Sequence, residues 1–178
     1  MNRTVIWQIG RAEMVRRALL GLAFLLLPLS AAIPAGPDAP VLTIMRHGAP
    51  PITRTLAALK SMPAMSVQVQ DDSGAAAEYT GVSLQVLLAA SDVEFGKAIR
   101  GARLTQYVVV SAADGYRALF SIAEVDPAFR QRSILLCYAK NGSSLPEKEG
   151  LLRLVVADEI RHARWVRQVT TIEVGILP

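Results

Sequence analysis

The stretch Leu135–Val156, "LLCYAKNGSSLPEKEGLLRLVV", holds two apolar runs on either side of a polar connection. The first run begins one residue before the stretch and is Ile134–Ala139, which has the pattern of a buried strand. The second is Leu151–Val156, which is apolar apart from Arg153 and is also predicted to be a strand. Asn141-Gly142, just after the first run, is a dipeptide that favours a tight turn. This stretch therefore predicts a buried strand, a turn and a second strand.

Short strands are also predicted on both sides of this stretch. Met65–Gln70 alternates apolar and polar residues, which is typical of a half-exposed strand. Gln106–Ser111, "QYVVVS", is the clearest buried strand, and Asp114-Gly115 after it predicts the turn of a hairpin. The other predicted strands are Val41–Met45, residues 75–79, Tyr116–Phe120 and Trp165–Val174. Together they make about eight short strands.

Few helices are predicted among these strands. Thr53 and Ser83 are each placed to cap a short helix. A third short helix is predicted around Ile122–Arg130, and Gly81 is expected to break the chain before the second helix. Because there is no regular alternation of strand and helix and no internal repeat, we expect a single α+β domain. Its sheet should be mainly antiparallel or mixed, with two or three short helices.

The first 32 residues have the pattern of a secretory signal peptide. Arginines precede a 12-residue apolar run, Ala18–Leu29, and the small residues Ser30–Ala32 follow it. Spanning a bilayer takes about 20 apolar residues, so cleavage after Ala32 is predicted, with an uncleaved membrane anchor as the alternative. Residues 33–40 then form a flexible, proline-rich linker, and residues 41–178 form the domain. The mature protein is expected to be periplasmic or secreted, with no membrane contact.

Much of the positive charge lies in this leader. The chain has 19 basic and 15 acidic residues, and residues 1–32 hold four of the basic and one of the acidic ones. The rest of the chain therefore has 15 basic and 14 acidic residues, a net charge of +1. No basic run with interleaved aromatic residues is present, so nucleic acid is not a predicted partner. A single cysteine, Cys137, excludes an internal disulfide.

Five phrases, in order along the chain, carry a resemblance to a known family. They are Tyr79–Leu84 (YTGVSL), Ser111–Tyr116 (SAADGY), Leu135–Val156, Arg164–Arg167 (RWVR) and Ile172–Val174 (IEV). In this order and spacing, residues 79–174 resemble the sulfite-oxidase-type molybdopterin-binding fold, and in particular the small exported members of that superfamily. The resemblance implies that residues 41–178 are a domain of this type.

The resemblance also implies a cofactor. In the full enzymes of this family a pterin dithiolene holds molybdenum, oxygen-atom transfer takes place at the metal, and a cysteine thiolate supplies a further soft ligand. That cysteine follows the strand that corresponds here to Met65–Gln70, where this chain continues with Asp71–Gly74. Cys137 lies in a predicted buried strand, where a free thiol packs as a small apolar group. The chain is therefore expected to lack the metal ligand, and to bind either molybdopterin without it or no cofactor.

Five residues are candidates for contacts with such a cofactor, and His162 lies among them as a further possible cation. Arg161 and Arg164 fall in the basic segment that the family uses for this purpose, and Arg153 adds a third guanidinium group. Guanidinium groups suit phosphate and other oxyanions. Asp114 and Tyr116 lie in the hairpin that the family places near its pocket. The alternatives are that the arginines form a solvated face paired with neighbouring acidic residues, and that the Asp-Gly pair is only a turn.

Arg46–Gly48 also resembles the Arg-His-Gly triplet of histidine phosphatases. That mechanism needs a second histidine and an acidic proton donor, and the only other histidine, His162, lacks the small-residue context of that family. We therefore interpret Gly48 and Pro50-Pro51 as a turn with His47 facing solvent. Two histidines and one cysteine at wide spacing predict no metal site, and no catalytic residue is assigned.

Two functions from different classes fit these residues. The first is an exported molybdopterin-binding-type oxidoreductase domain whose catalysis is degenerate because the cysteine ligand is absent. The second is a non-catalytic periplasmic module that uses the same fold to bind a small-molecule ligand or a partner, such as a redox protein. Because a fold does not by itself transfer activity, the sequence leaves open whether the chain is an enzyme.

Overall fold

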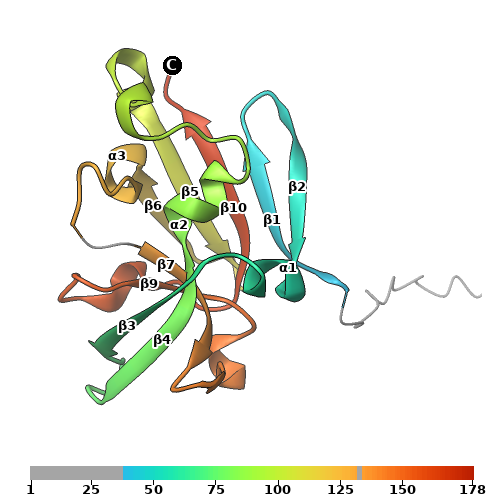
Figure 1. Ribbon diagram of the computed structural model, residues 1–178, viewed down its shortest axis with the longest axis vertical. Coiled ribbons are helices and arrows are strands. Elements are labelled where there is room, and N and C mark those ends of the chain that lie inside the picture. The colour runs from blue at the N-terminus through green and yellow to red at the C-terminus, as the bar shows by residue number, and fades with distance from the viewer. Residues whose placement is uncertain (1–37, 132–133) are drawn as a thin grey trace, which may run out of the picture. The chain divides into compact units, whose positions relative to one another are not determined.

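Among the residues that the structure describes, the fold consists of two five-stranded β-sheets and three short α-helices (Figure 1). The computed structural model describes residues 38–131 and 134–178. The predicted signal peptide (1–32) and most of the predicted linker (33–40) lie outside the described residues. The α+β class is confirmed, although the described part contains ten strands rather than about eight. No helix in that part has the length and apolar character needed to cross a bilayer.

The first sheet is mixed and is built from β1 (Pro40–Arg46), β2 (Ala49–Thr55), β5 (Gln106–Ala112), β6 (Arg117–Ser121) and β10 (Val169–Ile176). Its order is β2-β1-β10-β5-β6, and only β1 and β10 run parallel. The predicted turn after β1 ends at Gly48, because Pro50 and Pro51 lie in β2. That strand forms the edge of the sheet, where a residue without a backbone N–H is tolerated.

The second sheet is antiparallel and is built from β3 (Ala64–Gln70), β4 (Ala76–Ser83), β7 (Ile134–Lys140), β8 (Ser143–Ser144) and β9 (Arg153–Val156). Its order is β3-β4-β7-β8, and β9 pairs with the first half of β7. The opening sequence stretch therefore forms β7, β8 and β9. The turn that joins β7 and β8 contains Asn141 and Gly142, as predicted.

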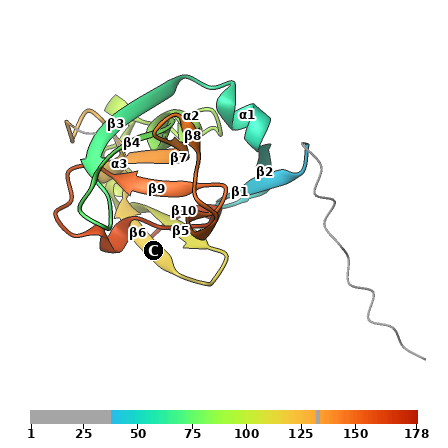
Figure 2. The same cartoon turned by 90° about the horizontal axis from the view of Figure 1, so that it is seen from below.

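A single apolar core lies against both sheets. Ile44 and Val108 from the first sheet and Leu136 and Leu154 from the second belong to one buried cluster. α2 (Leu84–Ala89) adds three fully buried leucines to it. Seen from below, β7 and β9 lie over β10 and β5 (Figure 2). Burial of these apolar side chains stabilises the packing of one sheet on the other.

Two helices differ in their bounds from the predictions. α1 (Leu56–Lys60) begins after Thr55, whose hydroxyl accepts a hydrogen bond from the first turn, so the predicted cap Thr53 is wrong. α3 (Ile122–Val125) has a Ser-Glu capping box and is shorter than predicted. Asp126 ends it in an extended conformation, because a residue before proline avoids helical geometry.

Two strand boundaries also differ. Gly81 does not break the chain but lies inside β4, where a Cβ atom would lie 2.1 Å from the carbonyl oxygen of Leu136. β10 begins at Val169 rather than at Trp165, and Gln168 before it has a left-handed backbone with φ of 50°. The segment before β10 is thereby free of the sheet and contributes to the site described next.

Candidate functional site

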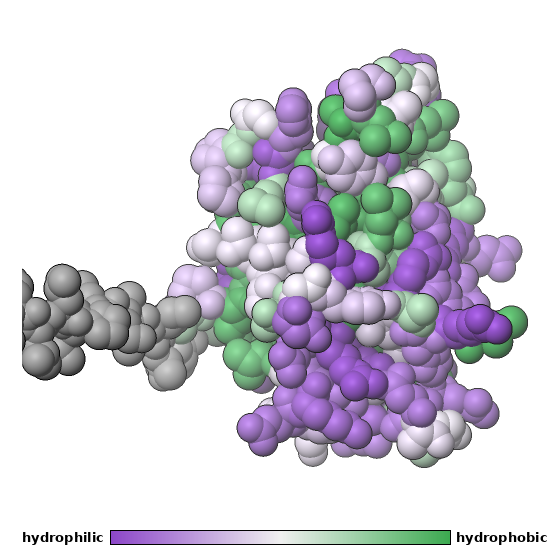
Figure 3. Space-filling model, turned by 180° about the vertical axis from the view of Figure 1, so that it is seen from behind, coloured by the Kyte–Doolittle hydropathy of each residue, from purple (hydrophilic) through white to green (hydrophobic). Residues whose placement is uncertain are grey.

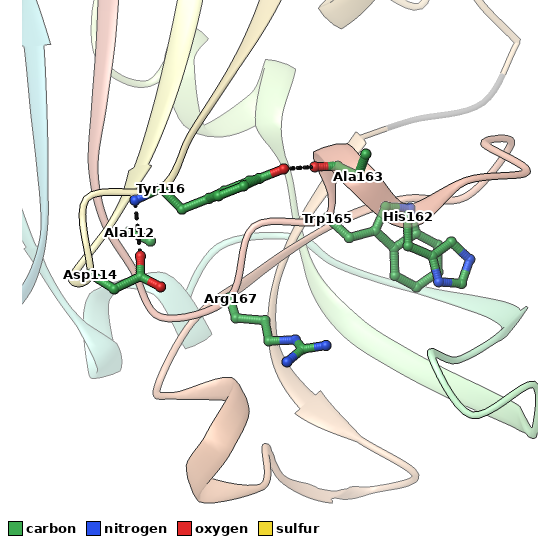
Figure 4. Close-up of a pocket in the computed structure, with 7 residues that line it drawn as sticks. All are labelled: Ala112, Asp114, Tyr116, His162, Ala163, Trp165 and Arg167. Carbon is green, nitrogen blue, oxygen red and sulfur yellow. Dashed lines mark hydrogen bonds between the residues drawn. The ribbon is translucent and has the colours of Figure 1, made fainter.

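The hairpin between β5 and β6 is tied to the chain that precedes β10. The backbone N–H of Tyr116 donates to Asp114 Oδ1 at 2.9 Å, which closes the turn. The Tyr116 hydroxyl donates to the carbonyl oxygen of Ala163 at 2.5 Å. Its ring thus reaches from the hairpin to η4 (His162–Arg164), as Figure 4 shows. This bond joins two segments 47 residues apart in the sequence and fixes their spacing.

Trp165 forms an aromatic surface beside this contact. Its side chain is buried, and its indole N–H donates to the carbonyl oxygen of Val156 at 2.9 Å. The imidazole of His162 stacks on the indole, with ring centroids 3.7 Å apart and planes 13° from parallel (Figure 4). The buried indole therefore sets the orientation of the His162 ring.

A cavity of about 280 Å³ opens between these groups. It is lined by Ala112, Asp114, Tyr116, His162, Ala163, Trp165 and Arg167. Its volume lies just below the range of about 300–1,000 Å³ that is usual for ligand sites. The lining combines aromatic rings with side chains of both charge signs, which suits a small polar ligand.

The carboxylate of Asp72, in the turn between β3 and β4, contacts three basic side chains at the edge of this cavity. Arg153 Nη2 donates to its two oxygens at 3.0 and 2.9 Å, and Arg167 Nη2 donates to Oδ2 at 2.6 Å. His162 Nδ1 lies 3.0 Å from Oδ1. Burial opposes ionisation of Asp72, but the hydrogen bonds from His162 and Arg153 outweigh it and lower its pKa to about 2.

A buried ion pair adjoins this carboxylate. Arg153 and Glu149 are 1% and 2% exposed, and their Nη1 and Oε2 atoms lie 2.9 Å apart. Tyr79 donates to Glu149 Oε2 at 3.2 Å, and burial raises the pKa of its hydroxyl, so it keeps its proton. Lys140 Nζ lies 3.4 Å from Glu149 Oε1 and 2.7 Å from Asp71 Oδ2. Glu149 therefore has two cationic partners inside the protein.

Three of the five predicted cofactor contacts lie at this site. Asp114 and Tyr116 line the cavity. Arg153 does not belong to an exposed basic face, which was the alternative interpretation of the arginines. It is buried in β9 and reaches Asp72, whose other partners His162 and Arg167 line the cavity.

The other two predicted contacts, Arg164 and Arg161, lie elsewhere. Arg164 pairs with Glu124 at 2.9 Å and with Glu159 at 2.6 Å, and its guanidinium lies 4.5 Å from the ring centroid of Phe120. It lines a separate cavity beside α3. Arg161 is exposed, and no acidic side chain within residues 38–131 and 134–178 lies within 4.0 Å of its guanidinium.

Three residues of the site were not predicted from the sequence: Asp72, Trp165 and Arg167. Asp72 has the local pattern of a turn residue. The signal that could have found the other two is the family phrase Arg164–Arg167, which contains both. His162 belongs to the predicted group of cations, and it lines the cavity.

His47 takes no part in this site. It lies in the exposed turn after β1, and its backbone N–H donates to the carbonyl oxygen of Val174 at 3.1 Å. Its side chain lines another cavity together with Arg46 and Asp92, which form an ion pair at 3.1 Å. Since His47 and His162 line different cavities, they do not form the facing pair that a histidine phosphatase requires.

Comparisons with known proteins agree with this fold. The family model described as oxidoreductase molybdopterin binding domain matches residues 52–175. Among solved structures, the sulfane dehydrogenase SoxCD from Paracoccus pantotrophus is similar, with a TM-score of 0.58 and 19% sequence identity. The match covers 75% of this chain and 37% of that chain, so this chain spans little more than a third of it. At this identity the likeness concerns the fold alone. A comparison with curated protein sequences gave no match.

Proposed function

This chain belongs to the oxidoreductase molybdopterin-binding domain family, and from that premise we propose that it is an exported, catalytically degenerate member whose cavity binds a small polar ligand. The leader-like first 32 residues support the export. The cavity between the β5–β6 hairpin and the chain before β10 supports the binding role.

The position of the only cysteine carries the proposal. Cys137 lies in the middle of β7, its side chain is fully buried, and it lines none of the cavity. Burial raises the pKa of its thiol, so the thiolate that a soft metal ligand requires is disfavoured. The turn after β3, where the family resemblance implies a cysteine, carries Asp71 and Asp72 instead.

The residues around the cavity do not fit a thiolate-held molybdenum cofactor. Of the two acidic residues in the turn after β3, Asp71 pairs with Lys140, and Asp72 already accepts hydrogen bonds from Arg153 and Arg167. Within the described part of the chain, no cluster of three or more histidine, cysteine or acidic side chains is placed to hold a metal ion. The cavity is also small for a pterin with its phosphate. We therefore derive no redox step from this site.

The groups that are present suit binding and positioning. Trp165 and the stacked His162 offer a flat aromatic edge, and Arg167 offers a guanidinium fork. The hydrogen bond from Tyr116 to Ala163 holds the two walls of the cavity at a constant distance. A site held in this way loses little conformational entropy when a ligand binds.

Retention of a pterin without the cysteine ligand is the second candidate function. The match of the family model over residues 52–175 favours it, as does the presence of Asp114 and Tyr116 at the cavity. In that case the guanidinium groups would hold the pterin phosphate, and the pterin itself would supply the redox chemistry.

Metal and pterin analysis separates these candidates. The full chain should be expressed in a host that makes molybdopterin and purified after export, beside Cys137→Ala as a matched variant. We expect molybdenum and pterin far below one per chain in both proteins. One molybdenum per chain in the wild-type protein would overturn the proposal, and its loss in Cys137→Ala would identify Cys137 as the ligand. One pterin per chain without metal would establish the second candidate.

The export itself is tested by the mass of the exported protein. We expect a mature chain that begins at Ile33, because the small residues Ser30–Ala32 suit signal-peptide cleavage. Ala32→Leu should slow this cleavage and lead to accumulation of the precursor. If the mass of the wild-type protein corresponds to a chain that begins at Met1, the result would contradict the proposal and support a membrane anchor.

A further inference from the structure

Asp72 occupies its position in the manner of a bound anion. Its carboxylate accepts hydrogen bonds from Arg153 and Arg167 and lies within hydrogen-bonding distance of His162. These three side chains come from β9, from η4 and from the segment before β10. Each arginine donates to the carboxylate through one nitrogen, Nη2, and basic side chains that converge on one oxyanion in this way also suit a phosphate or sulfate group.

Asp72 is not needed to neutralise the buried arginine. Arg153 already pairs with Glu149 at 2.9 Å, and both side chains are almost completely buried. Lys140 pairs with Asp71 at 2.7 Å, which balances the next pair of charges. The negative charge of Asp72 therefore balances the positive charge of Arg167, whose side chain is 49% exposed. This pair is partly exposed, so it contributes less to stability than the buried pair of Arg153 with Glu149.

The side chain of Asp72 can leave without loss of the turn. Asp71 holds the turn through its carboxylate, which accepts from the backbone N–H groups of Ser73 at 2.8 Å and Ala75 at 3.2 Å. The backbone N–H of Asp71 also donates to the carbonyl oxygen of Ala75 at 2.8 Å. Asp72 makes none of these bonds, so a rotation of its side chain would break its contacts with the three basic groups and leave the turn closed.

The three basic groups are continuous with the cavity. His162 and Arg167 contact Asp72 and also line the cavity beside Trp165. In Figure 4 the ring of His162 lies on that of Trp165, and Arg167 is drawn between these rings and Asp114. An anionic group in place of the Asp72 carboxylate would therefore lie next to the space that holds the rest of a ligand. In addition, no acceptor among the described residues faces the buried Nε of Arg153.

We propose that Asp72 is an internal counter-anion in an oxyanion subsite, and that the ligand of the cavity carries a phosphate or sulfate group which displaces Asp72 from Arg153, His162 and Arg167. This inference rests on the proposed binding function and names the ligand class and the group that competes with it. Because the pKa of Asp72 is lowered, its carboxylate remains ionised at neutral pH. The ligand must therefore compete with a charge, and does not wait for Asp72 to be protonated.

Phosphate binding to Asp72→Asn tests the proposal. The change keeps the size of the side chain and removes the competing charge. Inorganic phosphate, followed by calorimetry or by amide chemical shifts, should bind the full chain of this variant about tenfold tighter than the wild type, or more. Glu147→Gln is the matched control. It removes one negative charge from an exposed residue that does not line the cavity and leaves Asp72 in place, so its affinity should stay within about twofold of the wild type.

Each possible result of these phosphate-binding measurements supports or overturns the proposal. Equal phosphate affinity in Asp72→Asn and the wild type would overturn the proposal, and so would a gain of equal size in Glu147→Gln. Failure of Asp72→Asn to fold would show that Asp72 is a structural counter-ion, which also overturns it. In the double variant Asp72→Asn/Arg167→Gln the gain should disappear, and its persistence would place the phosphate elsewhere.

The wild-type protein provides a second measurement. The carboxyl carbon signal of Asp72 should shift as phosphate or sulfate is added, because the side chain leaves its three partners, and a constant signal at saturating anion would contradict the proposal. Failure of this inference is distinct from failure of the proposed function. Stoichiometric molybdenum together with a gain in phosphate affinity in Asp72→Asn would overturn only the proposed function. A metal-free protein without that gain would overturn only the inference about Asp72.

Discussion

At the scale of single residues, Arg153 and Cys137 show how burial decides chemistry. Both lie on the second sheet, directly opposite each other in the pairing of β9 with β7. Arg153 keeps its charge in the interior because Glu149 lies 2.9 Å from it. Cys137 has no such partner, and burial therefore raises the pKa of its thiol. Arg153 is charged in the core and Cys137 is neutral there, because only Arg153 has an oppositely charged side chain in contact with it.

Loss of the Arg153 charge should strongly destabilise the fold. Arg153→Met leaves Glu149 buried with Lys140 as its remaining cationic partner. We expect the free energy of unfolding to fall by about 3–5 kcal/mol. Arg161→Met is the control, because that side chain is exposed, and it should change the free energy by less than about 0.5 kcal/mol. Urea unfolding measures both, and equal losses in the two variants would contradict the assignment of Arg153 to a buried ion pair.

The thiol of Cys137 should be inert in the folded protein. A thiol reagent needs access and a thiolate, and the buried position in β7 denies both. We expect labelling at a rate limited by unfolding, with one thiol per chain labelled fast in denaturant, since the chain has one cysteine. Free cysteine in the same buffer is the control for reagent activity. Fast labelling of the native protein would contradict the core position of this residue.

At the scale of elements, the close approach of β4 and β7 sets the geometry of the second sheet. Gly81 allows it, because any side chain there would meet the backbone of Leu136 and Cys137. The register of β4 on β7 shifts beside this glycine, between Thr80 and Gly81. Two residues earlier, Tyr79 is fully buried and reaches Glu149. The glycine thus acts through backbone contact, and not as the chain break that its residue type suggests.

A methyl group at position 81 should therefore cost more than one at an open glycine. In Gly81→Ala the new Cβ would lie 2.1 Å from the Leu136 carbonyl oxygen, so the strands must separate. We expect a loss of about 2–3 kcal/mol in the free energy of unfolding. Gly74→Ala is the control, since a Cβ atom there would meet nothing within 4 Å. Its φ of 81° is unfavourable for alanine and should lower the free energy of unfolding by about 1 kcal/mol. A smaller loss at Gly81 than at Gly74 would contradict the predicted clash.

The segment before β10 gains its role because it is not part of a strand. Trp165 is oriented by its hydrogen bond to Val156 and by the stacked His162. The left-handed Gln168 then redirects the chain into β10. Between them, Arg167 points toward Asp72 instead of entering the ladder with β5. An irregular segment held at both ends can therefore present several polar groups to one cavity.

At the scale of the whole molecule, acidic residues tie segments that lie far apart in the sequence. Asp71 pairs with Lys140, and Asp72 pairs with His162 and Arg167. Hydrogen bonds and ion pairs lower the pKa of both carboxyls below the value of 3.8 for an unperturbed aspartate. A carboxyl whose pKa is lower in the folded state stabilises the fold above the unfolded pKa. This contribution is lost as the pH falls toward the folded pKa.

The stability of the domain should therefore fall on acidification. We expect these two groups to contribute nothing to the pH dependence between about pH 6 and pH 8, and a steady loss of stability as the pH falls below about 4. Urea midpoints at pH 7, 5 and 3 measure it. Asp72→Asn removes one of the two titrating groups and should show a smaller loss between pH 5 and pH 3. An identical loss in this variant would mean that Asp72 is not part of the acid transition.

Local patterns determined the elements of this protein. Apolar runs and alternation predicted β3, β5, β7 and β9, and the turn dipeptides predicted the hairpins, because strand period and turn geometry depend on neighbouring residues. The same locality explains the errors. Thr53 and Gly81 have the residue types of a cap and a breaker, but the position of Thr53 in β2 and of Gly81 against β7 overrode those preferences.

The meeting of Asp72 with Arg153, His162 and Arg167 was decided only by the tertiary structure. These partners lie 81, 90 and 95 residues from Asp72 along the chain. The strand order β3-β4-β7, with β9 on β7, and the irregular chain before β10 bring them together. All four residues of β9 are buried, so no alternation in its sequence indicates where Arg153 points. Sequence neighbours specify strands and turns, whereas contacts between charges depend on which strands pair and how the two sheets pack.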